Sequence, residues 1–365
     1  MIKIGMVGVG AISGIYLENI TKTFKEIELE AVCDLIRERA EKAREKYNVP
    51  KIYDTMQELF ADPEIDIVLN LTRPYEHYEV TRQALEAGKH VYSEKPLGAA
   101  WDEGKKLAAL AEAKGLYLGG APDTFLGAGI QTCRKLIDAG MIGEPIAAQA
   151  VMAGHGHETW HPDPEFYYKF GGGPMLDMGP YYITALINLL GGVKSAVGVT
   201  KTSFKKRMIT SEPFAGTVID VDVPTHINGI LTFDSGVIGT ILTTFDVYSN
   251  DGMHLDIYGT EGTLICPDPN TFGGPIKIIR GEDKGGAYEI PIMFEYKENS
   301  RALGLADMAK AIESKRAPRA SYKQTLHVLE IMTTLNAGTG SAVELTTKYE
   351  RERPMVKPEL AGVLD

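Results

Sequence analysis

The stretch that decides the fold reads IKIGMVGVGAISG, residues 2–14. Its apolar residues up to Val7 predict a strand, and Gly8 and Gly10 lie between that strand and a helical pattern. Glycines at such a turn let the backbone approach a pyrophosphate, which binds at the positive N-terminus of the following helix. The strand–turn–helix context, more than the glycines alone, predicts a dinucleotide-binding unit.

The second predicted strand ends in Asp34, at the place where a carboxylate binds the adenosine ribose hydroxyls and favours NAD over NADP. Ser13 replaces the third glycine of the usual pattern. Arg37 and Arg39 follow closely, and an arginine there can bind a 2′-phosphate, so NADP stays open as an alternative. The candidate cofactor contacts in this part are Gly8, Gly10, Ala11, Ile12, Asp34 and Arg39.

Up to about residue 120, short apolar runs alternate with amphipathic helical stretches. The predicted strands are Lys3–Val7, Leu29–Cys33, Ile67–Leu71, Val91–Ser93 and Leu116–Gly119, and the helices Arg37–Tyr47, His77–Ala87 and Ala100–Ala113. This alternation is typical of α/β folds with parallel strands and right-handed crossovers. We therefore expect residues 1–121 to form a Rossmann domain with a doubly wound parallel sheet.

The pattern changes after residue 121. Helices are predicted at Gly127–Ala139, Tyr181–Leu190, Ala302–Lys315 and Gln324–Thr334, and strands at Ile146–Met152, His226–Phe233, Val237–Val247 and His254–Tyr258. Most of residues 193–292 reads as strands joined by tight turns. A second, α+β domain of residues 122–365 is therefore expected, built on an open, mainly antiparallel sheet.

The composition is that of a globular chain of 365 residues, 44% hydrophobic, which is long enough for two domains. The 38 Lys and Arg against 49 Asp and Glu give a net charge of −11, which argues against nucleic-acid and anionic-membrane partners. No apolar run is long enough to span a membrane, and the first strand follows no signal-peptide pattern. Three scattered cysteines indicate a reducing compartment, so a cytoplasmic protein is expected.

Polar residues follow the third and fourth predicted strands, at the sheet edge where such folds bind ligands. Thr72 is expected to meet the cofactor, and His77 either to do the same or to cap the next helix. Lys95 would reach the same crevice, although a lysine in a turn is usually only solvated. The candidate cofactor contacts here are Thr72, Arg73, His77, Glu94, Lys95 and Pro96.

Three segments of the chain form a specific combination: Glu94-Lys95-Pro96, GGGPMLDMG at residues 171–179, and YGTEGTL at residues 258–264. Together they resemble the Gfo/Idh/MocA oxidoreductases, a family that includes glucose–fructose oxidoreductase, inositol dehydrogenase and dihydrodiol dehydrogenase. The resemblance covers nearly the whole chain. It implies an NAD(P)-binding Rossmann domain and a second domain whose sheet carries substrate residues on one face. Its other face is implied to form homodimers or homotetramers.

By this resemblance, Lys95 and Asp177 match the family's catalytic lysine and carboxylate. Family members usually have histidine four residues after that aspartate, whereas this chain has Tyr181, as dihydrodiol dehydrogenase-like members do. An aromatic core residue is the alternative interpretation of Tyr181. A nearby ammonium favours a phenolate, so Lys95 would help Tyr181 to accept a hydroxyl proton while Asp177 orients a neighbouring hydroxyl.

The loop HGHETWHPD, residues 155–163, has the composition of either a sugar pocket or a metal site. We expect His157, Trp160 and His161 to bind a sugar or polyol and no metal to be present, because hydride transfer with NAD requires none. Structural roles and a metal site remain the alternatives. Asp123 and Phe125, where the chain leaves the first domain, are also expected to contact substrate.

These observations predict an NAD(P)-dependent oxidoreductase that transfers a hydride between nicotinamide and a hydroxyl or carbonyl carbon of a sugar, cyclitol or related polyol. An enzyme that cleaves glycosides by transient oxidation with bound NAD is the alternative, because it shares the hydride machinery. A non-enzymatic NAD sensor is less favoured, since sensing needs only the first domain.

Overall fold

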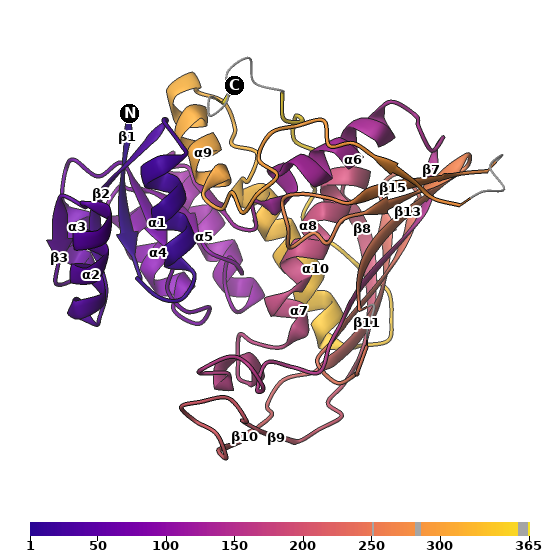
Figure 1. Ribbon diagram of the computed structural model, residues 1–365, viewed down its shortest axis with the longest axis horizontal. Coiled ribbons are helices and arrows are strands. Elements are labelled where there is room, and N and C mark those ends of the chain that lie inside the picture. The colour runs from indigo at the N-terminus through magenta and orange to yellow at the C-terminus, as the bar shows by residue number, and fades with distance from the viewer. Residues whose placement is uncertain (250–251, 282–285, 357–363) are drawn as a thin grey trace. The chain divides into compact units, whose positions relative to one another are not determined.

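The structure is a computed structural model that describes residues 1–249, 252–281, 286–356 and 364–365. It divides into two compact units (Figure 1). The first unit comprises Met1–Gly127, Phe294–Leu326 and Met355–Asp365, and the second comprises Ala128–Met293 and His327–Pro354. No helix among the described residues combines the length and the apolar character needed to cross a membrane.

A six-stranded parallel sheet forms the first unit, in the order β3-β2-β1-β4-β5-β6. Its strands are β1 (Ile2–Val7), β2 (Ile27–Cys33), β3 (Lys51–Tyr53), β4 (Ile67–Asn70), β5 (His90–Ser93) and β6 (Leu118–Gly120). Its helices are α1 (Ser13–Lys22), α2 (Arg37–Tyr47), α3 (Met56–Ala61), α4 (His77–Glu86), α5 (Trp101–Lys114) and α9 (Leu303–Ser314). The strand order reverses between β1 and β4, which confirms the predicted doubly wound sheet.

The sequence prediction missed β3 and α3, because three and six residues are too short to show a period. A capping box marks the start of α3 and was the available signal. The Thr55 hydroxyl accepts the backbone N–H of Glu58 at 3.2 Å, and the Glu58 carboxylate accepts the backbone N–H of Thr55 at 3.1 Å.

The second unit contains a nine-stranded sheet in the order β16-β15-β14-β13-β7-β12-β11-β8-β17. Its strands are β7 (Pro145–Ala153), β8 (Val193–Lys201), β11 (His226–Phe233), β12 (Ile238–Thr244), β13 (Met253–Gly259), β14 (Gly262–Cys266), β15 (Ile276–Arg280), β16 (Tyr288–Ile290) and β17 (Val343–Glu344), and a separate ribbon pairs β9 (Lys206–Met208) with β10 (Val218–Asp220). Only the β7–β12 pair is parallel in the nine-stranded sheet. The predicted mainly antiparallel sheet is therefore confirmed.

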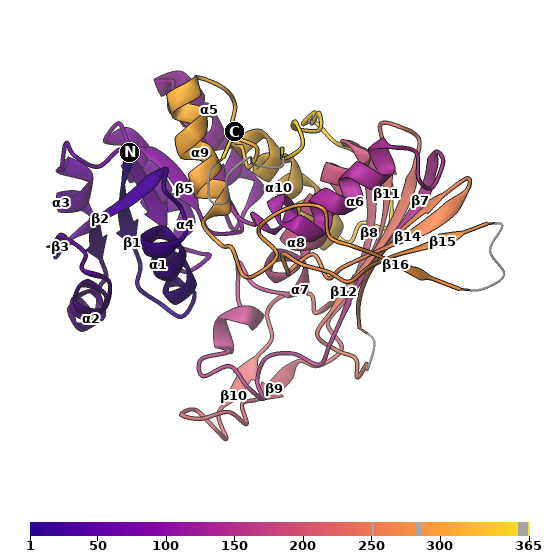
Figure 2. The same cartoon turned by 45° about the horizontal axis from the view of Figure 1, so that its top comes forward.

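One face of this sheet packs against helices (Figure 2). The helices of the unit are α6 (Ala128–Asp138), α7 (Pro174–Asp177), α8 (Gly179–Leu190) and the greater part of α10 (Tyr322–Ala337). Gly198 of β8 lets α10 approach closely, since a Cβ there would come within 2.1 Å of the Leu335 carbonyl oxygen. The other face keeps apolar side chains exposed, among them Val199, Ile230 and Ile238, which are 47–58% exposed.

The compact units differ from the expected division after residue 121, because helix α9 belongs to the first unit. Asn19 of α1 donates to the Asn299 and Arg301 carbonyl oxygens at 2.8 Å each, and the Gly304 N–H donates to Asp123 at 3.0 Å. These contacts join segments about 180 or more residues apart, so neither composition nor periodicity could reveal them.

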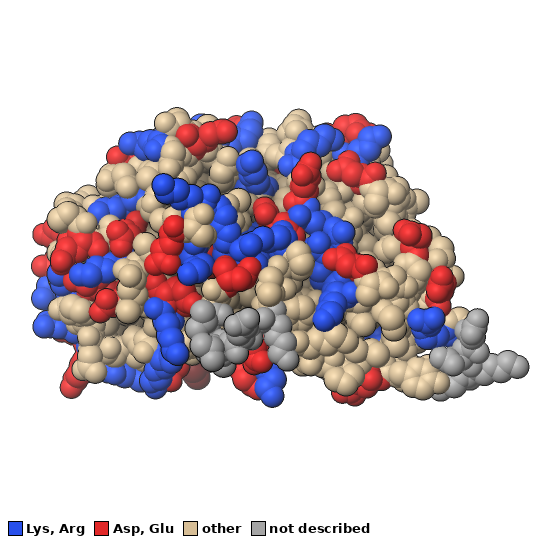
Figure 3. Space-filling model, turned by 90° about the horizontal axis from the view of Figure 1, so that it is seen from above, with Lys and Arg blue, Asp and Glu red and all other residues tan. Residues whose placement is uncertain are grey.

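Acidic and basic side chains are interspersed on the face shown in Figure 3. The ion pair that ties α9 to its unit is buried. The Asp307 side chain is fully buried. Its carboxylate accepts bonds from Arg319 Nη1 at 2.6 Å, from the Arg319 backbone N–H at 2.7 Å and from Arg316 Nη2 at 2.7 Å. Removing one partner of such a group leaves uncompensated buried charge.

We therefore expect Asp307→Ala to destabilise the protein by up to about 3–5 kcal/mol, because Arg319 would lose its buried carboxylate and keep only Asp365, which is 28% exposed. Urea or thermal unfolding measures the change. Glu313→Ala on the same helix is the matched control, since its pair with Lys310 is surface-exposed and spans 3.7 Å, and it should change stability by less than about 1 kcal/mol. Equal effects of the two substitutions would contradict the assignment of the buried pair.

Candidate active site

The glycine-rich turn after β1 packs directly against the end of β4. Gly8 has φ +96°, and a Cβ there would lie 2.8 Å from the Leu71 carbonyl oxygen, so only glycine fits. Gly10 and Gly14 face open space, and no side chain caps the N-terminus of α1. Ser13, in place of a third glycine, is buried and donates its hydroxyl to the Gly10 carbonyl oxygen at 2.7 Å. An open turn before an uncapped helix N-terminus fits an anionic dinucleotide.

Asp34 holds this turn to the end of β2. Its carboxylate accepts the Val9 N–H at 2.6 Å and the Ile36 N–H at 2.7 Å, which orients the oxygens at the edge of the turn. Arg37 pairs with Glu41 and Asp54, whereas Arg39 is exposed on α2. The charge of Arg37 is therefore already compensated within the protein.

His77 lies between the loops that follow β4 and β5 and is 1% exposed. Its Nδ1 is 2.7 Å from the Pro96 carbonyl oxygen and its Nε2 is 3.0 Å from the Thr72 carbonyl oxygen. Burial lowers the pKa of His77 despite these two acceptors. The His77 ring thus lies between the two loops, and its expected cofactor contact stays a prediction.

Glu94 is likewise buried, and its expected cofactor contact stays a prediction. Its carboxylate accepts the Tyr16 hydroxyl of α1 at 2.7 Å and the backbone N–H of Lys95 at 3.0 Å. Burial, followed by the Glu94 charge, raises the pKa of Tyr16, so this hydroxyl remains a donor. Glu94 therefore connects the backbone of Lys95, whose side chain is half-buried, to the helix that begins at the nucleotide turn.

Thr72 is half-buried and its hydroxyl donates to the Asn70 side chain at 2.7 Å, while Arg73 is exposed and Pro96 is buried. Asp123 and Phe125, expected to contact substrate, are each 1% exposed. Burial raises the pKa of Asp123 to about 6, and its carboxylate accepts the Gly304 N–H. The substrate role expected of both residues stays a prediction.

In the second unit, the glycine-rich segment leads into α7, which ends at Asp177. Gly173 has φ +87° and its carbonyl oxygen accepts the Asp177 N–H at 3.0 Å, which sets the start of this one-turn helix. Met178 separates α7 from α8, so Asp177 and Tyr181 lie on different helices. Tyr181 is 7% exposed near the start of α8.

The His157 side chain contacts the Asp177 carboxylate. Its Nε2 lies 3.5 Å from Asp177 Oδ2, and each side chain is 13% exposed. The imidazole stacks on Tyr167 with ring centres 3.9 Å apart, and the Phe245 ring, steeply inclined to it at 76°, is centred 4.7 Å away. The Asp177 carboxylate and the His157 imidazole thus lie close together among aromatic rings.

Trp160 extends this group of rings toward solvent. The residue is 62% exposed, and its ring centre lies 5.2 Å from that of His157 and 5.4 Å from that of His161. His155, by contrast, stacks on Tyr248 at 3.8 Å. Within the described ranges, no group of three or more His, Cys, Asp or Glu side chains is arranged to hold a metal ion.

The sequence analysis missed a buried ionic cluster beneath this loop. Arg207 of β9 pairs with Glu158 at 2.7 Å and with Asp246 at 2.6 Å, and Tyr168 donates to Glu158. The signal in the sequence was weak, because the four residues are spread over nearly 90 positions.

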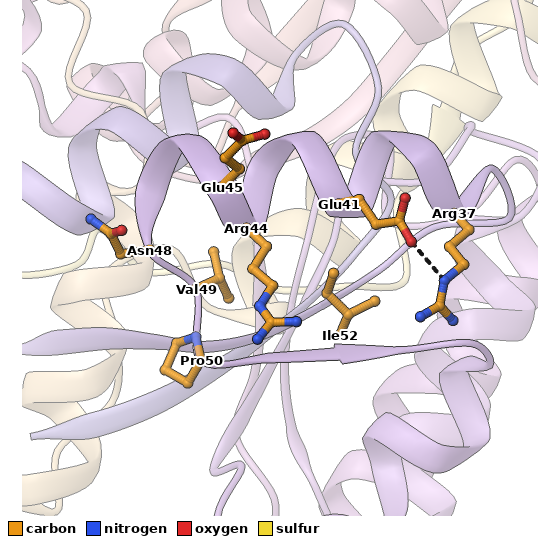
Figure 4. A pocket seen from close by; sticks show the side chains of 8 residues that line it. All are labelled: Arg37, Glu41, Arg44, Glu45, Asn48, Val49, Pro50 and Ile52. Atoms are coloured by element: carbon orange, nitrogen blue, oxygen red, sulfur yellow. Dashed lines mark hydrogen bonds and ion pairs between the residues drawn. The ribbon is translucent and has the colours of Figure 1, made fainter.

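A surface pocket lies between α2 and β3 (Figure 4), and it contains none of the candidate catalytic or substrate-binding residues. It is lined by Arg37, Glu41, Arg44, Glu45, Asn48, Val49, Pro50 and Ile52. Arginines and glutamates alternate along its rim, and Arg37 donates to Glu41 at 2.9 Å. Its charges therefore largely compensate one another.

Several curated proteins are similar in sequence. Over 319 residues the chain is 23% identical to the myo-inositol 2-dehydrogenase of Thermotoga maritima, covering 87% of this chain and 90% of that protein. It is 27% identical to the trans-1,2-dihydrobenzene-1,2-diol dehydrogenase of Bos taurus, covering 77% and 78%. A shorter match is 32% identical to the inositol 2-dehydrogenase/D-chiro-inositol 3-dehydrogenase of Lactiplantibacillus plantarum and covers 40% of this chain and 42% of that protein.

Solved structures share the fold over nearly the whole chain. An NAD-binding oxidoreductase from Klebsiella pneumoniae superposes with a TM-score of 0.82 at 21% identity, and levoglucosan dehydrogenase in complex with NADH and L-sorbose with 0.81 at 19%. Each comparison covers 95% of this chain and 99% of the other.

The sequence also matches the two domain profiles of a single family. Residues 2–120 match its N-terminal profile, described as an oxidoreductase family with an NAD-binding Rossmann fold, and residues 130–265 match a C-terminal domain profile of the same family. The chain therefore belongs to the Gfo/Idh/MocA family of NAD-binding oxidoreductases.

Proposed function

We propose that this protein is an NAD-dependent dehydrogenase that oxidises a hydroxyl group of a sugar, cyclitol or related polyol. The observation that carries the substrate class is the His157–Asp177 pair among aromatic rings. A carboxylate and an imidazole bind adjacent hydroxyls, while aromatic faces pack on the C–H surface of a sugar-like ring. Relatives named as inositol and dihydrodiol dehydrogenases, both of which act on ring hydroxyls or diols, support this class.

The first unit supplies the residues that would hold the cofactor. The pyrophosphate would lie over Gly10, Ala11 and Ile12 at the N-terminus of α1, and Asp34 would accept the ribose hydroxyls. Leu35 is 94% exposed beside Asp34 and offers an apolar contact to the adenine ring. When bound, NAD supplies the hydride acceptor.

The chain's own residues would then accept the proton and orient the substrate. Oxidation of a hydroxyl requires that its proton leave as the carbonyl forms. Tyr181 would accept this proton, helped by the positive charge of Lys95, while Asp177 and His157 hold a neighbouring hydroxyl. In the opposite direction the Tyr181 hydroxyl would donate the proton back.

The roles of Lys95 and Tyr181 are tested by Lys95→Ala and Tyr181→Phe. Each is expected to lower kcat for polyol oxidation by at least about 100-fold, because Tyr181→Phe removes the proton acceptor and Lys95→Ala removes the charge that favours its phenolate. NAD binding, measured by NADH fluorescence, should remain detectable in both variants. Unchanged turnover in both variants would rule out these roles.

The cofactor preference is tested by Asp34→Ala. Loss of the carboxylate should weaken NAD binding about tenfold and lower the preference for NAD over NADP, because the hydrogen bonds to the ribose hydroxyls are lost. Isothermal titration with both dinucleotides measures this change. Asp102→Ala, which removes an exposed carboxylate of α5 in the same unit, is the control and should leave both affinities within about twofold. Equal behaviour of the two variants would contradict the role of Asp34.

We further propose that the chain forms homodimers or homotetramers through the open face of the nine-stranded sheet. Exposed apolar side chains on paired strands of this face would be covered by a second copy. Ile230→Glu should therefore reduce the mass measured by light scattering, because it buries a charge in the interface. Phe214→Glu, at an exposed apolar position outside the nine-stranded sheet, is the control and should not. An unchanged mass for Ile230→Glu would contradict this interface.

A further inference from the structure

The β9–β10 ribbon brings one arginine into contact with two buried carboxylates. Arg207 is 5% exposed, and its guanidinium donates to Glu158 at 2.7 Å and to Asp246 at 2.6 Å. It also donates to the carbonyl oxygens of His155 at 3.2 Å and Phe245 at 2.7 Å. One side chain thus joins the ribbon, the loop that contains His157 and the segment that follows β12.

The two carboxylates are further fixed by hydroxyl groups. Thr225 donates to Asp246 at 2.8 Å, and Tyr168 donates to Glu158. Burial, followed by the bond to Glu158, raises the pKa of Tyr168, so this phenol stays protonated and remains a donor. The Tyr168 hydroxyl also accepts the backbone N–H of His157 at 3.4 Å.

Residues 155–161 are bonded to the ribbon segment at further points. The Glu158 carbonyl oxygen accepts the backbone N–H groups of Thr210 at 2.9 Å and Ser211 at 3.2 Å. The Ser211 hydroxyl donates to the His161 carbonyl oxygen at 2.6 Å. Gly156 has φ +89°, and a Cβ there would lie 2.2 Å from the Tyr168 hydroxyl oxygen, so the backbone is packed directly onto the cluster.

We propose that Arg207 is a positioning residue for the substrate: through Glu158 and Asp246 it holds residues 155–161 so that the His157 ring faces Asp177. The inference rests on the proposed function for its substrate, and on the contacts of the second unit for its geometry. His157 directly precedes Glu158 in the chain, so displacement of Glu158 moves the ring that lies 3.5 Å from Asp177.

A contribution to fold stability does not by itself explain such a cluster. Three buried charges lose hydration, and apolar residues of similar volume often stabilise a protein as well or better. A guanidinium, however, bonds several oxygens in a fixed planar geometry, which a flexible ammonium cannot reproduce. The cluster therefore suits a loop whose exact orientation matters for ligand binding.

The direct test reads the orientation of His157 without cofactor or substrate. Histidine-labelled protein, with the His157 signal assigned by His157→Gln, is titrated by NMR in wild-type, Asp177→Asn, Arg207→Met and doubly substituted forms. The titratable groups facing the ring are Asp177, the stacked Tyr167 and, at its backbone, Tyr168 and Glu158. A neighbouring carboxylate favours the imidazolium, so Asp177→Asn should lower the measured His157 pKa by about 0.5–1 unit.

In the Arg207→Met background, Asp177→Asn should shift the His157 pKa by less than about a third of this amount, because the ring no longer faces residue 177. Lys206→Met is the matched control on the same strand. Its pair with Asp220 spans 2.9 Å between side chains that are 67–69% exposed, and it should leave the full shift. If Arg207→Met does not fold, Glu158→Gln replaces it, since that variant keeps the Arg207–Asp246 pair.

Steady-state kinetics provides the functional readout. Arg207→Met or Glu158→Gln should raise KM for the polyol about tenfold or more, with kcat changed less and NADH affinity within about twofold of wild type. Arg207→Lys should fall between, because it restores the charge without the planar contacts.

A full Asp177-dependent shift in Arg207→Met, together with an unchanged KM, would overturn the proposal and leave the cluster a purely structural role. If the wild type oxidises no polyol, the proposed function fails, whereas the NMR comparison still decides the role of Arg207.

Discussion

The architecture of the nucleotide turn depends on the close approach of Gly8 to the backbone after β4. At φ +96°, with no room for a Cβ beside Leu71, this residue brings the ends of β1 and β4 together. Its N–H donates to the Cys33 carbonyl oxygen at 2.9 Å, so the end of β2 joins the same point, and Asp34 then binds the next N–H of the turn. Three strands of a doubly wound sheet thus converge where α1 begins, and the strand order reverses at the same place.

Around this point, buried polar groups position the residues that would act. His77 joins the loops after β4 and β5 by its two ring nitrogens, and Glu94 joins Lys95 to Tyr16 of α1. In the second unit Arg207 has the corresponding role under the loop of His157. The same arrangement occurs in both units. A buried side chain forms several hydrogen bonds, and these bonds fix a neighbouring residue that is partly exposed.

The sequence predicted the elements with a clear period, including five of the six Rossmann strands, the α2 helix and the β11–β12 hairpin, because burial on one face or both imposes that period. It failed where contacts come from distant segments. No pattern in the sequence indicated that the Asp123 carboxylate accepts the N–H of Gly304, which is 181 residues away. The cluster around Arg207 escaped notice for the same reason, since its partners meet only after the ribbon folds back on the loop.

The central claim is that a polyol hydroxyl is oxidised with hydride transfer to NAD. It is tested most directly with a panel of sugars, inositols and glycosides, each offered with NAD to protein freed of nucleotide, while NADH absorbance and products are followed. We expect that one polyol yields NADH and its carbonyl product in equal amounts. Cleavage of a glycoside without net NADH formation, or no NADH with any polyol, would contradict it.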